Sequence, residues 1–526
     1  MESVNTMIRE IIRKELLINL LSLRFAAGLV VSILMMGLVG YVLVEDFVSR
    51  QQTYISDVQR HNKELEQTKV YSMVEVQVDI PPSPLFVFSR GIRDLPTSIA
   101  VSPYHIPSLI DEGRGLVSIY LGGTSNRPYN PLLRVFASID LSFVISMILS
   151  LFAIVLVFDS FSGEREQGTL KLLLSTSAGR VHLLIGKFFG ALVSLAIPLT
   201  IGFLEVMVLW SVSSRLSLEA SSWFGLGLLY LFSLLFLSSF LALALLVSLY
   251  ARESSSCLMW LLLMWVLVAI VIPQGGEYLS EYLRPQETRE STVRAAEQAS
   301  RDFSRAYANI PYSQKSEWNG FRMNPTEGEA ILGITQDEIP DRIEFNKKAF
   351  PLKFRLAEER RRVFESYAIA LRSWSRMRNN VMRSSLCVLF NNVSQAIAGT
   401  DIDSYEIAVL RARMYHDALM TYLEPKIGKP EWFTRALEYP DVQPTEQNQT
   451  YWQSVVEKEG ERAVERLLSW DRVAPVDLST MPPPSVGFAG LAERTANAMP
   501  DGLLLIAGTG LFLALSIRRV IRYPIN

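Results

Sequence analysis

The sequence predicts a mainly α membrane protein with six transmembrane helices and a largely helical extracytoplasmic domain. Apolar residues gather in separate runs of about 20, the length of helix that crosses the ~30 Å hydrocarbon core of a bilayer. Charged residues, which make up 20% of the chain, gather between these runs. With 49% hydrophobic residues, the chain of 526 residues is too apolar for a soluble enzyme. It is also too charged to be a bundle of spans alone.

The apolar runs predict where the six spans lie. The predicted spans are residues 25–44, 140–159, 188–210, 223–249, 257–273 and 501–517. The last of them is weakly defined, because its uncharged run from Leu503 to Ile517 covers only about 22 Å as a helix. We therefore expect either that residues 497–502 extend it or that the bilayer thins locally.

The positions of Lys and Arg predict the orientation, because short cytoplasmic loops are enriched in both. Basic residues gather before span one, between spans two and three, between spans four and five, and after span six: Arg9, Arg13, Lys14, Arg24, Arg165, Lys171, Arg180, Lys187, Arg252, Arg518, Arg519 and Arg522. Acidic residues dominate the opposite ends. Both termini, including the tail 518–526, are thus expected in the cytoplasm.

Two long segments are then expected outside the cytoplasm. Residues 45–139 contain an alternating stretch, 71–80, that predicts a half-exposed strand. Residues 274–500 are as long as a whole domain. Strand-like alternation is scarce in them, and helices are predicted at 284–308, 352–382, 403–423 and 453–470.

Residues 1–24 carry apolar side chains at three- and four-residue spacing, with charged residues on the other side. This pattern predicts an amphipathic helix that lies in the cytoplasmic membrane interface. A plain cytoplasmic extension of span one is the alternative.

The segment 160–187, between spans two and three, carries the clearest functional signal. A short helix bearing Glu164 and Glu166 can engage basic groups of a partner, and Leu170, Leu173 and Leu174 can occupy an apolar cleft on it. The alternative is that the carboxylates are solvated and the leucines face lipid. The residues alone leave both readings open.

This segment resembles the ABC-2 type permease family, which has a Glu-x-Glu-x-Gly-Thr-Leu-x-x-Leu-Leu-Ser run there, followed by Arg-x-x-x-x-x-x-Lys. The matching residues are Glu164, Glu166, Gly168, Thr169, Leu170, Leu173, Leu174, Ser175, Arg180 and Lys187, with Arg165 inside the run. The Pro that usually follows the Ser is absent. Residues 12–25 resemble the family's interfacial helix. Residues 84–91 and 394–401 resemble elements of a subgroup with a large insertion before the last span, which includes gliding-motility and nitrous-oxide-reductase maturation permeases.

The resemblance implies a fold like that of type V ABC exporters and the function of a permease subunit in a bacterial inner membrane. It implies two ABC ATPase subunits that bind ATP and Mg, and a second permease copy or a related permease. The segment 160–187 would be the coupling loop to the ATPase. The subunit would drive export or relay mechanical work to an extracytoplasmic partner protein. This chain contains no Gly-x-x-x-x-Gly-Lys-Ser/Thr phosphate loop, so we expect a non-catalytic subunit without a cofactor of its own.

A membrane-anchored enzyme or sensor, with its activity in the extracytoplasmic domain, is the alternative function.

A net charge of −2 gives no indication of nucleic-acid binding. The few histidines and cysteines show no metal-ligand spacing: His61, His105, His182, His416, Cys257 and Cys387. Within the spans, Glu205 is a functional candidate because ionisable groups are costly in lipid. The alternative is that it reaches the outer headgroup layer or bonds a neighbouring helix. Pro198 is expected to kink span three.

Overall fold

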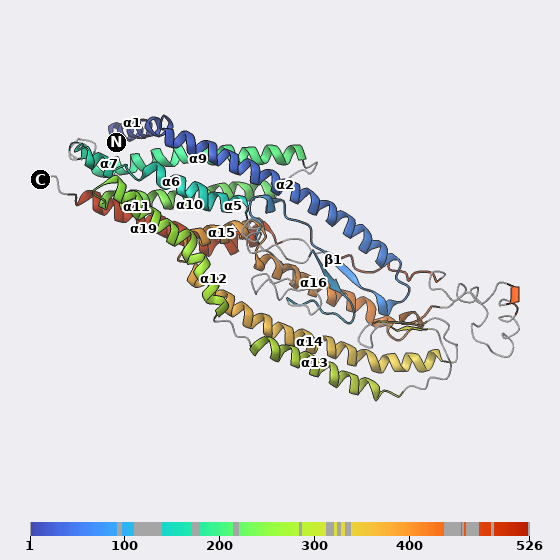
Figure 1. Ribbon diagram of the computed structural model, residues 1–526. Coiled ribbons are helices and arrows are strands. Elements are labelled where there is room, and N and C mark those ends of the chain that lie inside the picture. Colours follow the sequence, from blue (N-terminus) through green and yellow to red (C-terminus); the bar gives the residue numbers. More distant parts are fainter. Residues whose placement is uncertain are drawn as a thin grey trace.

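The computed structural model describes residues 2–91, 97–109, 139–170, 172, 179–213, 220–282, 287–311, 320–322, 328–331, 338–435, 454, 457–458, 473–484 and 489–523. The molecule is elongated (Figure 1). A bundle of apolar helices lies at the end that holds both termini. A second body, which we call the distal domain, lies at the other end and contains helices α13 (Glu287–Ala308), α14 (Ile339–Met382) and α16 (Ile402–Leu423) together with the small sheets.

Six helical runs among the described residues are long and apolar enough to cross a membrane, and the prediction of a mainly α protein with six spans is confirmed. In chain order they are α2 (Leu23–Glu66); α5 (Leu141–Val144), η3 (Ile145–Leu149) and α6 (Ser150–Val157), followed by α7 (Ser162–Glu166); α9 (Arg180–Ser213); α10 (Ala220–Tyr250); α11 (Ser254–Val266), η4 (Leu267–Val271) and α12 (Ile272–Tyr282); and α19 (Leu491–Ile521). Both η3 and η4 are π-helical.

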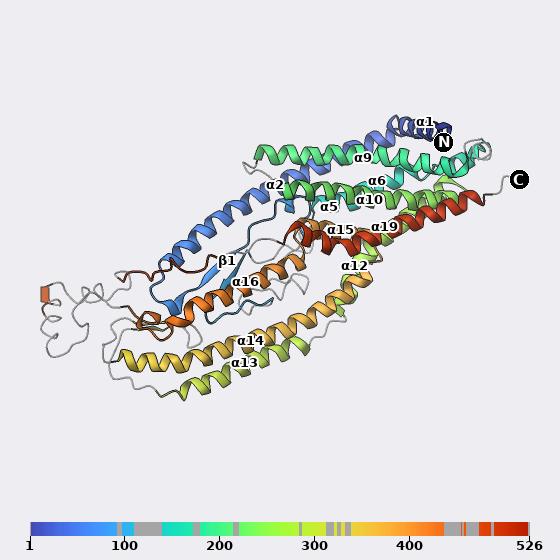
Figure 2. The same cartoon turned by 180° about the vertical axis from the view of Figure 1, so that it is seen from behind.

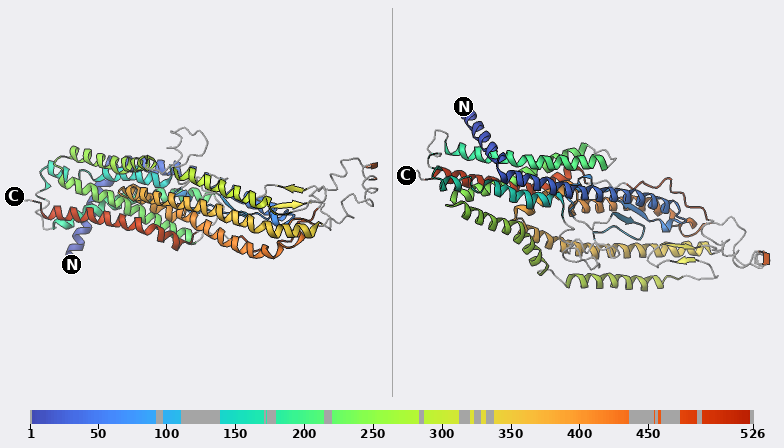
Figure 3. Two further views of the ribbon diagram at one scale, coloured as in Figure 1. Left: turned by 90° about the horizontal axis from the view of Figure 1, so that it is seen from below. Right: turned by 45° about the horizontal axis from the view of Figure 1, so that its top comes forward.

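The N-terminal segment forms a separate helix, α1 (Glu2–Leu20), rather than a direct extension of span one. The chain turns at Ser22, whose Oγ donates to the Asn19 carbonyl and accepts from the Phe25 amide, so that Ser22 caps α2. Figure 3 shows α1 turning away from the axis of the bundle. Close approach to α9 is possible because Gly186 and Gly190 leave room for Ile11 and Glu15.

Span one continues far beyond the predicted residues 25–44. Helix α2 has 44 residues, which is about 66 Å of helix and twice the thickness of the hydrocarbon core. Its outer half reaches the distal domain, where His61 Nδ1 lies 2.8 Å from Asp79 Oδ1. Residues 497–502 extend span six as expected, and α19 also includes residues 491–496 and 518–521.

The distal domain is largely helical, as predicted, with α13 (Glu287–Ala308), α14 (Ile339–Met382) and α16 (Ile402–Leu423). Helix α14 begins before the predicted residue 352 and contains Pro351. Short 3₁₀ turns occur as η1 (Tyr71–Met73), η2 (Pro84–Val87), η5 (Glu424–Lys426) and η6 (Pro430–Trp432). The predicted helix 453–470 falls mostly outside the described residues.

Two small antiparallel sheets accompany the helices. The first includes part of the strand predicted at 71–80, and the second adds two short strands to the segment 274–500, where helices were predicted. Strand β1 (Val76–Asp79) pairs with β2 (Ser98–Val101), and Val76 lies opposite Val101. Strand β3 (Gly320–Arg322) pairs with β4 (Glu329–Ile331). The first sheet comes from the segment 45–139, yet it packs on α16 of the second segment. The shared core contains Val76, Val78, Ile99, Val101, Tyr405, Val409, Leu419, Trp432 and Phe433. The two long segments therefore build one domain.

Helix α15 (Leu386–Ala398), within the predicted extracytoplasmic residues 274–500, packs against the spans. Its buried apolar residues belong to the same core as the spans. Figure 2 shows α15 beside α10 and α19, at the base of the distal domain.

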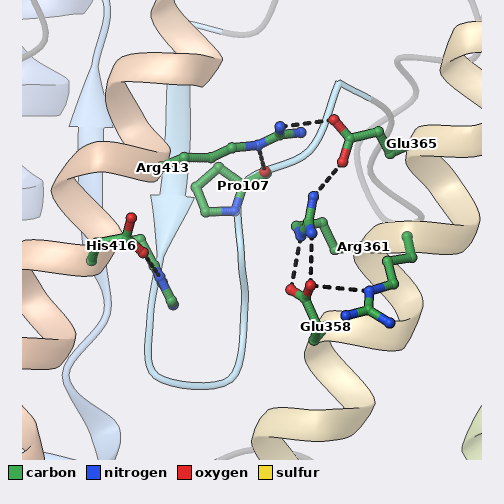
Figure 4. A network of polar contacts seen from close by, with 8 residues as sticks. Pro107, Glu358, Arg361, Glu365, Arg413 and His416 are labelled. Carbon is green, nitrogen blue, oxygen red and sulfur yellow. Dashed lines mark hydrogen bonds and ion pairs between the residues drawn. The ribbon is translucent and has the colours of Figure 1, made fainter.

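Arginines tie α14 to α16 in the network of Figure 4. Arg361 binds Glu358 (Nη2–Oε1 2.7 Å) and also Glu365. Arg413 of α16 binds Glu365 at 2.9 Å and donates to the Pro107 carbonyl at 2.7 Å. The hydrogen bond from Arg361 lowers the pKa of Glu358, although burial opposes this shift. The network holds two long helices and the loop after β2 in one unit.

Burial lowers the pKa of His416, against the opposing effect of Asp417. The folded domain thus holds the ring neutral, while an unfolded chain binds a proton once the pH falls through about 6.5. We expect the thermal midpoint of the purified protein to fall between about pH 7.5 and pH 5.5. His416→Phe, which keeps a ring stacked on Phe354, should reduce that fall. Intrinsic fluorescence measures the thermal midpoint of both proteins at each pH. An equal fall of the midpoint in wild type and variant would contradict this prediction.

Candidate functional site

The candidate site is the segment that follows span two, and its local shape is set by Gly168 and Thr169. Helix α7 ends as Gly168 adopts a φ of +72°, a conformation that favours glycine. The Thr169 amide and hydroxyl then donate to the Glu164 carbonyl at 3.0 and 3.1 Å. These two residues of the predicted motif thus close the end of the short helix.

Arg165 binds the end of span four. Its guanidinium donates to the carbonyls of Leu249 (3.0 Å) and Ala251, and its Nε donates to the Tyr523 hydroxyl at 3.2 Å. The last carbonyls of a helix have no partner within the helix. A cation there is also favoured by the helix dipole. Arg165 therefore caps α10 and connects it to the residues that follow α19.

Glu166 binds the start of span five. Its carboxylate accepts from the Ser254 amide at 2.8 Å and from the Ser254 hydroxyl at 2.9 Å. An acidic group at a helix N-terminus satisfies a free amide and complements the dipole. Together, Arg165 and Glu166 hold both sides of the turn between α10 and α11.

Glu164 takes part in a buried charge cluster with Lys187 and Glu15. Lys187 of α9 is only 5% exposed, and its Nζ lies 3.0 Å from Glu164 and 2.9 Å from Glu15 of α1. The ammonium group also lies 5.6 Å from the centre of the Phe161 ring. The cluster binds α1, α7 and α9 together at the end of the bundle that holds both termini.

Arg180, at the other end of the segment 160–187, binds helix-end carbonyls as Arg165 does. Its Nη1 donates to the carbonyls of Ile521 (2.7 Å) and Tyr523 (3.0 Å), at the end of α19. The predicted charges Glu164, Arg165, Glu166, Arg180 and Lys187 are thus engaged inside the chain. The sequence alone left open whether Glu164 and Glu166 engage a partner or are solvated, because their internal partners Lys187 and Ser254 are distant in the sequence.

What remains exposed is the tip of the segment. Residues 166–169 are exposed, and Leu172 has 71% of its surface accessible, whereas Leu170 is buried at 2%. Leu173 and Leu174 lie outside the described residues. Gln167 and Leu172 were not among the predicted site residues, although both sit within the matched motif.

The two intramembrane candidates lie on α9. Pro198 is buried inside this helix, which runs on from Arg180 to Ser213. Glu205 faces α2 at Gly37, where a Cβ would overlap its carboxylate. The space left by Gly37 therefore admits Glu205 between spans one and three. Among the described residues, no three His, Cys, Asp or Glu side chains are grouped so as to hold a metal.

Comparison with known proteins identifies the family. Residues 9–321, which include most of α1, the first five spans and the loop just described, match the model of the ABC-2 family transporter proteins. The chain belongs to the ABC-2 family. It is thus a multi-pass membrane protein, and the family supports a non-catalytic transporter component.

Two curated relatives are similar to part of this ABC-2 chain. One, from Pseudomonas aeruginosa, is named "Probable ABC transporter permease protein NosY" and is 35% identical over 161 residues, 28% of this chain and 56% of the relative. The other has the same name, comes from Stutzerimonas stutzeri and is 33% identical over 154 residues, 27% of this chain and 55% of the relative. The chain thus spans about half the length of the curated relatives it matches.

The Lys187 cluster predicts a large loss of stability on neutralisation. Lys187→Met leaves the partly buried Glu15 and Glu164 without their shared cation, and we expect a loss that approaches the about 3–5 kcal/mol of breaking a fully buried pair. Arg24→Met is the matched control, because the Arg24–Asp159 pair is much more exposed and such pairs contribute only about 0–1 kcal/mol. Thermal unfolding in detergent measures both variants. Equal midpoints for the two would contradict the assignment of a buried cluster.

Proposed function

We propose that this chain is the permease subunit of an ABC transporter, which couples ATP hydrolysis by two separate ATPase subunits to movement of its spans. The segment 160–187 is the contact for the ATPase, with ATP and Mg bound by that partner. Both termini lie in the cytoplasm of a bacterial cell, and the distal domain lies on the outer side of the inner membrane. A second copy of the chain, or a related permease, completes the pair.

One observation carries this proposal: residues 160–187 connect the ends of several helices while they leave an exposed tip. Glu164, Arg165, Glu166 and Arg180 bind residues at the ends of α9, α10, α11 and α19. A partner that pushes on Gln167 and Leu172 therefore acts on several spans at once. In this role the charged residues transmit force to the spans, and the exposed tip makes the contact with the ATPase.

The alternative, an enzyme or sensor centred on the distal domain, has less support. That domain does contain buried charges. Arg342 pairs with Glu329, and Lys353 lies over the ring of Tyr104 at 5.0 Å. These charged side chains are at most 5% exposed, so a substrate in water does not reach them. Their arrangement favours a structural role in holding β4 and the loop after β2 to α14.

Leu172→Asp tests the ATPase contact. A charge in place of this exposed leucine removes apolar contact with the partner but changes little inside the chain, because exposed sites tolerate substitution. We expect the amount of ATPase that co-purifies with the tagged chain from its native membranes to fall about tenfold, which corresponds to ~1.4 kcal/mol.

Leu410→Asp is the matched control, since Leu410 is an exposed leucine of α16 in the distal domain. It should retain the ATPase fully. Normal capture of ATPase by Leu172→Asp would contradict the assignment of the tip. Absence of any ATPase from the wild-type preparation would contradict the proposed function itself.

Two mechanisms remain within the proposal: export between paired permeases, and relay of work to a protein partner outside. The continuous helix α2 favours relay, because it connects the bundle to the distal domain without a break. In proteoliposomes that contain the complex, the relay mechanism predicts that candidate lipids and other cargoes leave ATP hydrolysis unchanged. A cargo that raises the rate of hydrolysis in a saturable manner would favour export.

A further inference from the structure

Helix α15 lies among the spans but does not cross the bundle. It has 13 residues, about 20 Å of helix, which is too short for a ~30 Å core. Near its start, Phe390 stacks on Phe236 of span four with ring centres 4.6 Å apart. Leu386 lies 3.7 Å from the place that a Cβ on Gly508 of span six would occupy. The start of α15 is therefore deep in the bundle, and the chain enters and leaves from the distal side.

Spans two and five each contain one π-helical segment of five residues, η3 and η4. In both segments, the first carbonyl accepts a bond from the amide five residues later, from Ser150 to Ile145 and from Ile272 to Leu267. Such segments are often found at functional sites, and they change the pairing of nearby backbone groups. The two spans are also joined directly, since Trp265 Nε1 donates to Ser150 Oγ at 2.9 Å.

The start of α15 binds the same position in both π segments. Cys387 Sγ lies 3.7 Å from the carbonyl of Ser146, the second residue of η3. Ser385 Oγ donates to the carbonyl of Val268, the second residue of η4. Ser385 also caps α15, because its Oγ accepts from the Val388 amide. Two side chains two residues apart thus connect one short helix to two spans.

Residues 383–385, which connect α14 to α15 and which we call the elbow, are fixed to span six by a polar cluster. Arg383 Nε lies 2.6 Å from Asp501 Oδ1, and Asn392 Nδ2 lies 3.3 Å from Asp501 Oδ2. Asp501 is buried, so losing its partners would be costly. Since Arg383 directly follows α14, this cluster also fixes the end of the long distal helix.

The far end of α15 is tied back to span two through residues 83–91. Ser83 donates to the Ala398 carbonyl at 2.6 Å, and Thr400 Oγ1 donates to the Ser89 carbonyl at 3.1 Å. The amide of Ser142, at the start of span two, donates to the Phe88 carbonyl at 3.2 Å. The two sequence elements 84–91 and 394–401, which lie in different segments of the chain, therefore meet here.

We propose that α15 is a re-entrant helix that transmits movement of spans two and five to α14 and α16 of the distal domain. Span two carries the exposed tip at its other end, so this inference rests on the proposed function for its source of motion. Ser385 and Cys387 are positioning residues. They hold α15 to both π segments, and α14 and α16 leave its two ends.

The first test removes both contacts with Ser385→Ala and Cys387→Ala in one chain. Hydrogen exchange of the complex is measured by mass spectrometry, without nucleotide and with ATP and vanadate. In the wild type we expect nucleotide to change exchange in α14 and α16. In the double variant we expect that change to be lost, while ATP hydrolysis and capture of the ATPase persist.

Ser233→Ala with Ser238→Ala is the matched control. Both hydroxyls are buried in the bundle and donate to carbonyls of their own helix α10, so the chemical change is similar but α15 keeps its contacts. The control should respond to nucleotide as the wild type does. A full response in the Ser385→Ala, Cys387→Ala variant would overturn the role of α15 and leave the proposed function intact.

A second test needs no ATPase. Gly276 of α12 lies against Met382 at the end of α14, and a Cβ on Gly276 would lie 3.9 Å from the Met382 Cβ, within the usual range for a disulfide. With copper phenanthroline as oxidant, Gly276→Cys and Met382→Cys should cross-link rapidly. Adding Ser385→Ala and Cys387→Ala should slow the reaction about tenfold, because the elbow is then less well held.

An unchanged cross-linking rate would show that the two contacts do not position the elbow, and it would overturn the inference whether or not an ATPase binds. A failure of the wild type to capture an ATPase would count against the proposed function alone. The two failures are thereby distinguishable.

Discussion

The backbone at the ends of membrane helices must find partners, and this requirement organises the end of the molecule that holds both termini. A helix leaves its last four carbonyls and first four amides without internal partners. Arg165, Glu166 and Arg180 supply partners for three different helices from one segment. Their contacts fix the relative positions of the spans, and the Lys187 cluster adds α1 to the same assembly. In the proposed function, the exposed tip of this segment makes the contact with the ATPase.

The spans could be predicted from the sequence because bilayer thickness sets the length of apolar run that a helix needs. The extent of the helices could not be predicted. Helix α19 includes Glu493, Arg494 and Asp501, which a hydropathy pattern reads as the end of a span. In the structure Arg383 binds Asp501 and Arg411 binds Glu493, so these acidic side chains are accommodated. Both partners lie far away in the chain, where a local pattern does not find them.

In the candidate site, too, the local sequence predicts some features, while others depend on residues that are distant in the chain. The Gly and Thr of the motif end a short helix with a left-handed residue. The direction in which Glu164 and Glu166 point depends on Lys187 and Ser254. Only the fold brings these groups together. The same is true of α15, whose apolar sequence suits the core of a soluble domain as well as a membrane bundle.

The length of helix α2 determines how far its outer end moves when the helix tilts. From the middle of its apolar run to Glu66 is about 45 Å of unbroken helix. A tilt of about 10° around that midpoint would carry the outer end sideways by about 8 Å. The end that moves is fastened to β1 through His61 and Asp79. A small change in the angle of α2 among the spans would therefore displace the attached part of the distal domain by several Å.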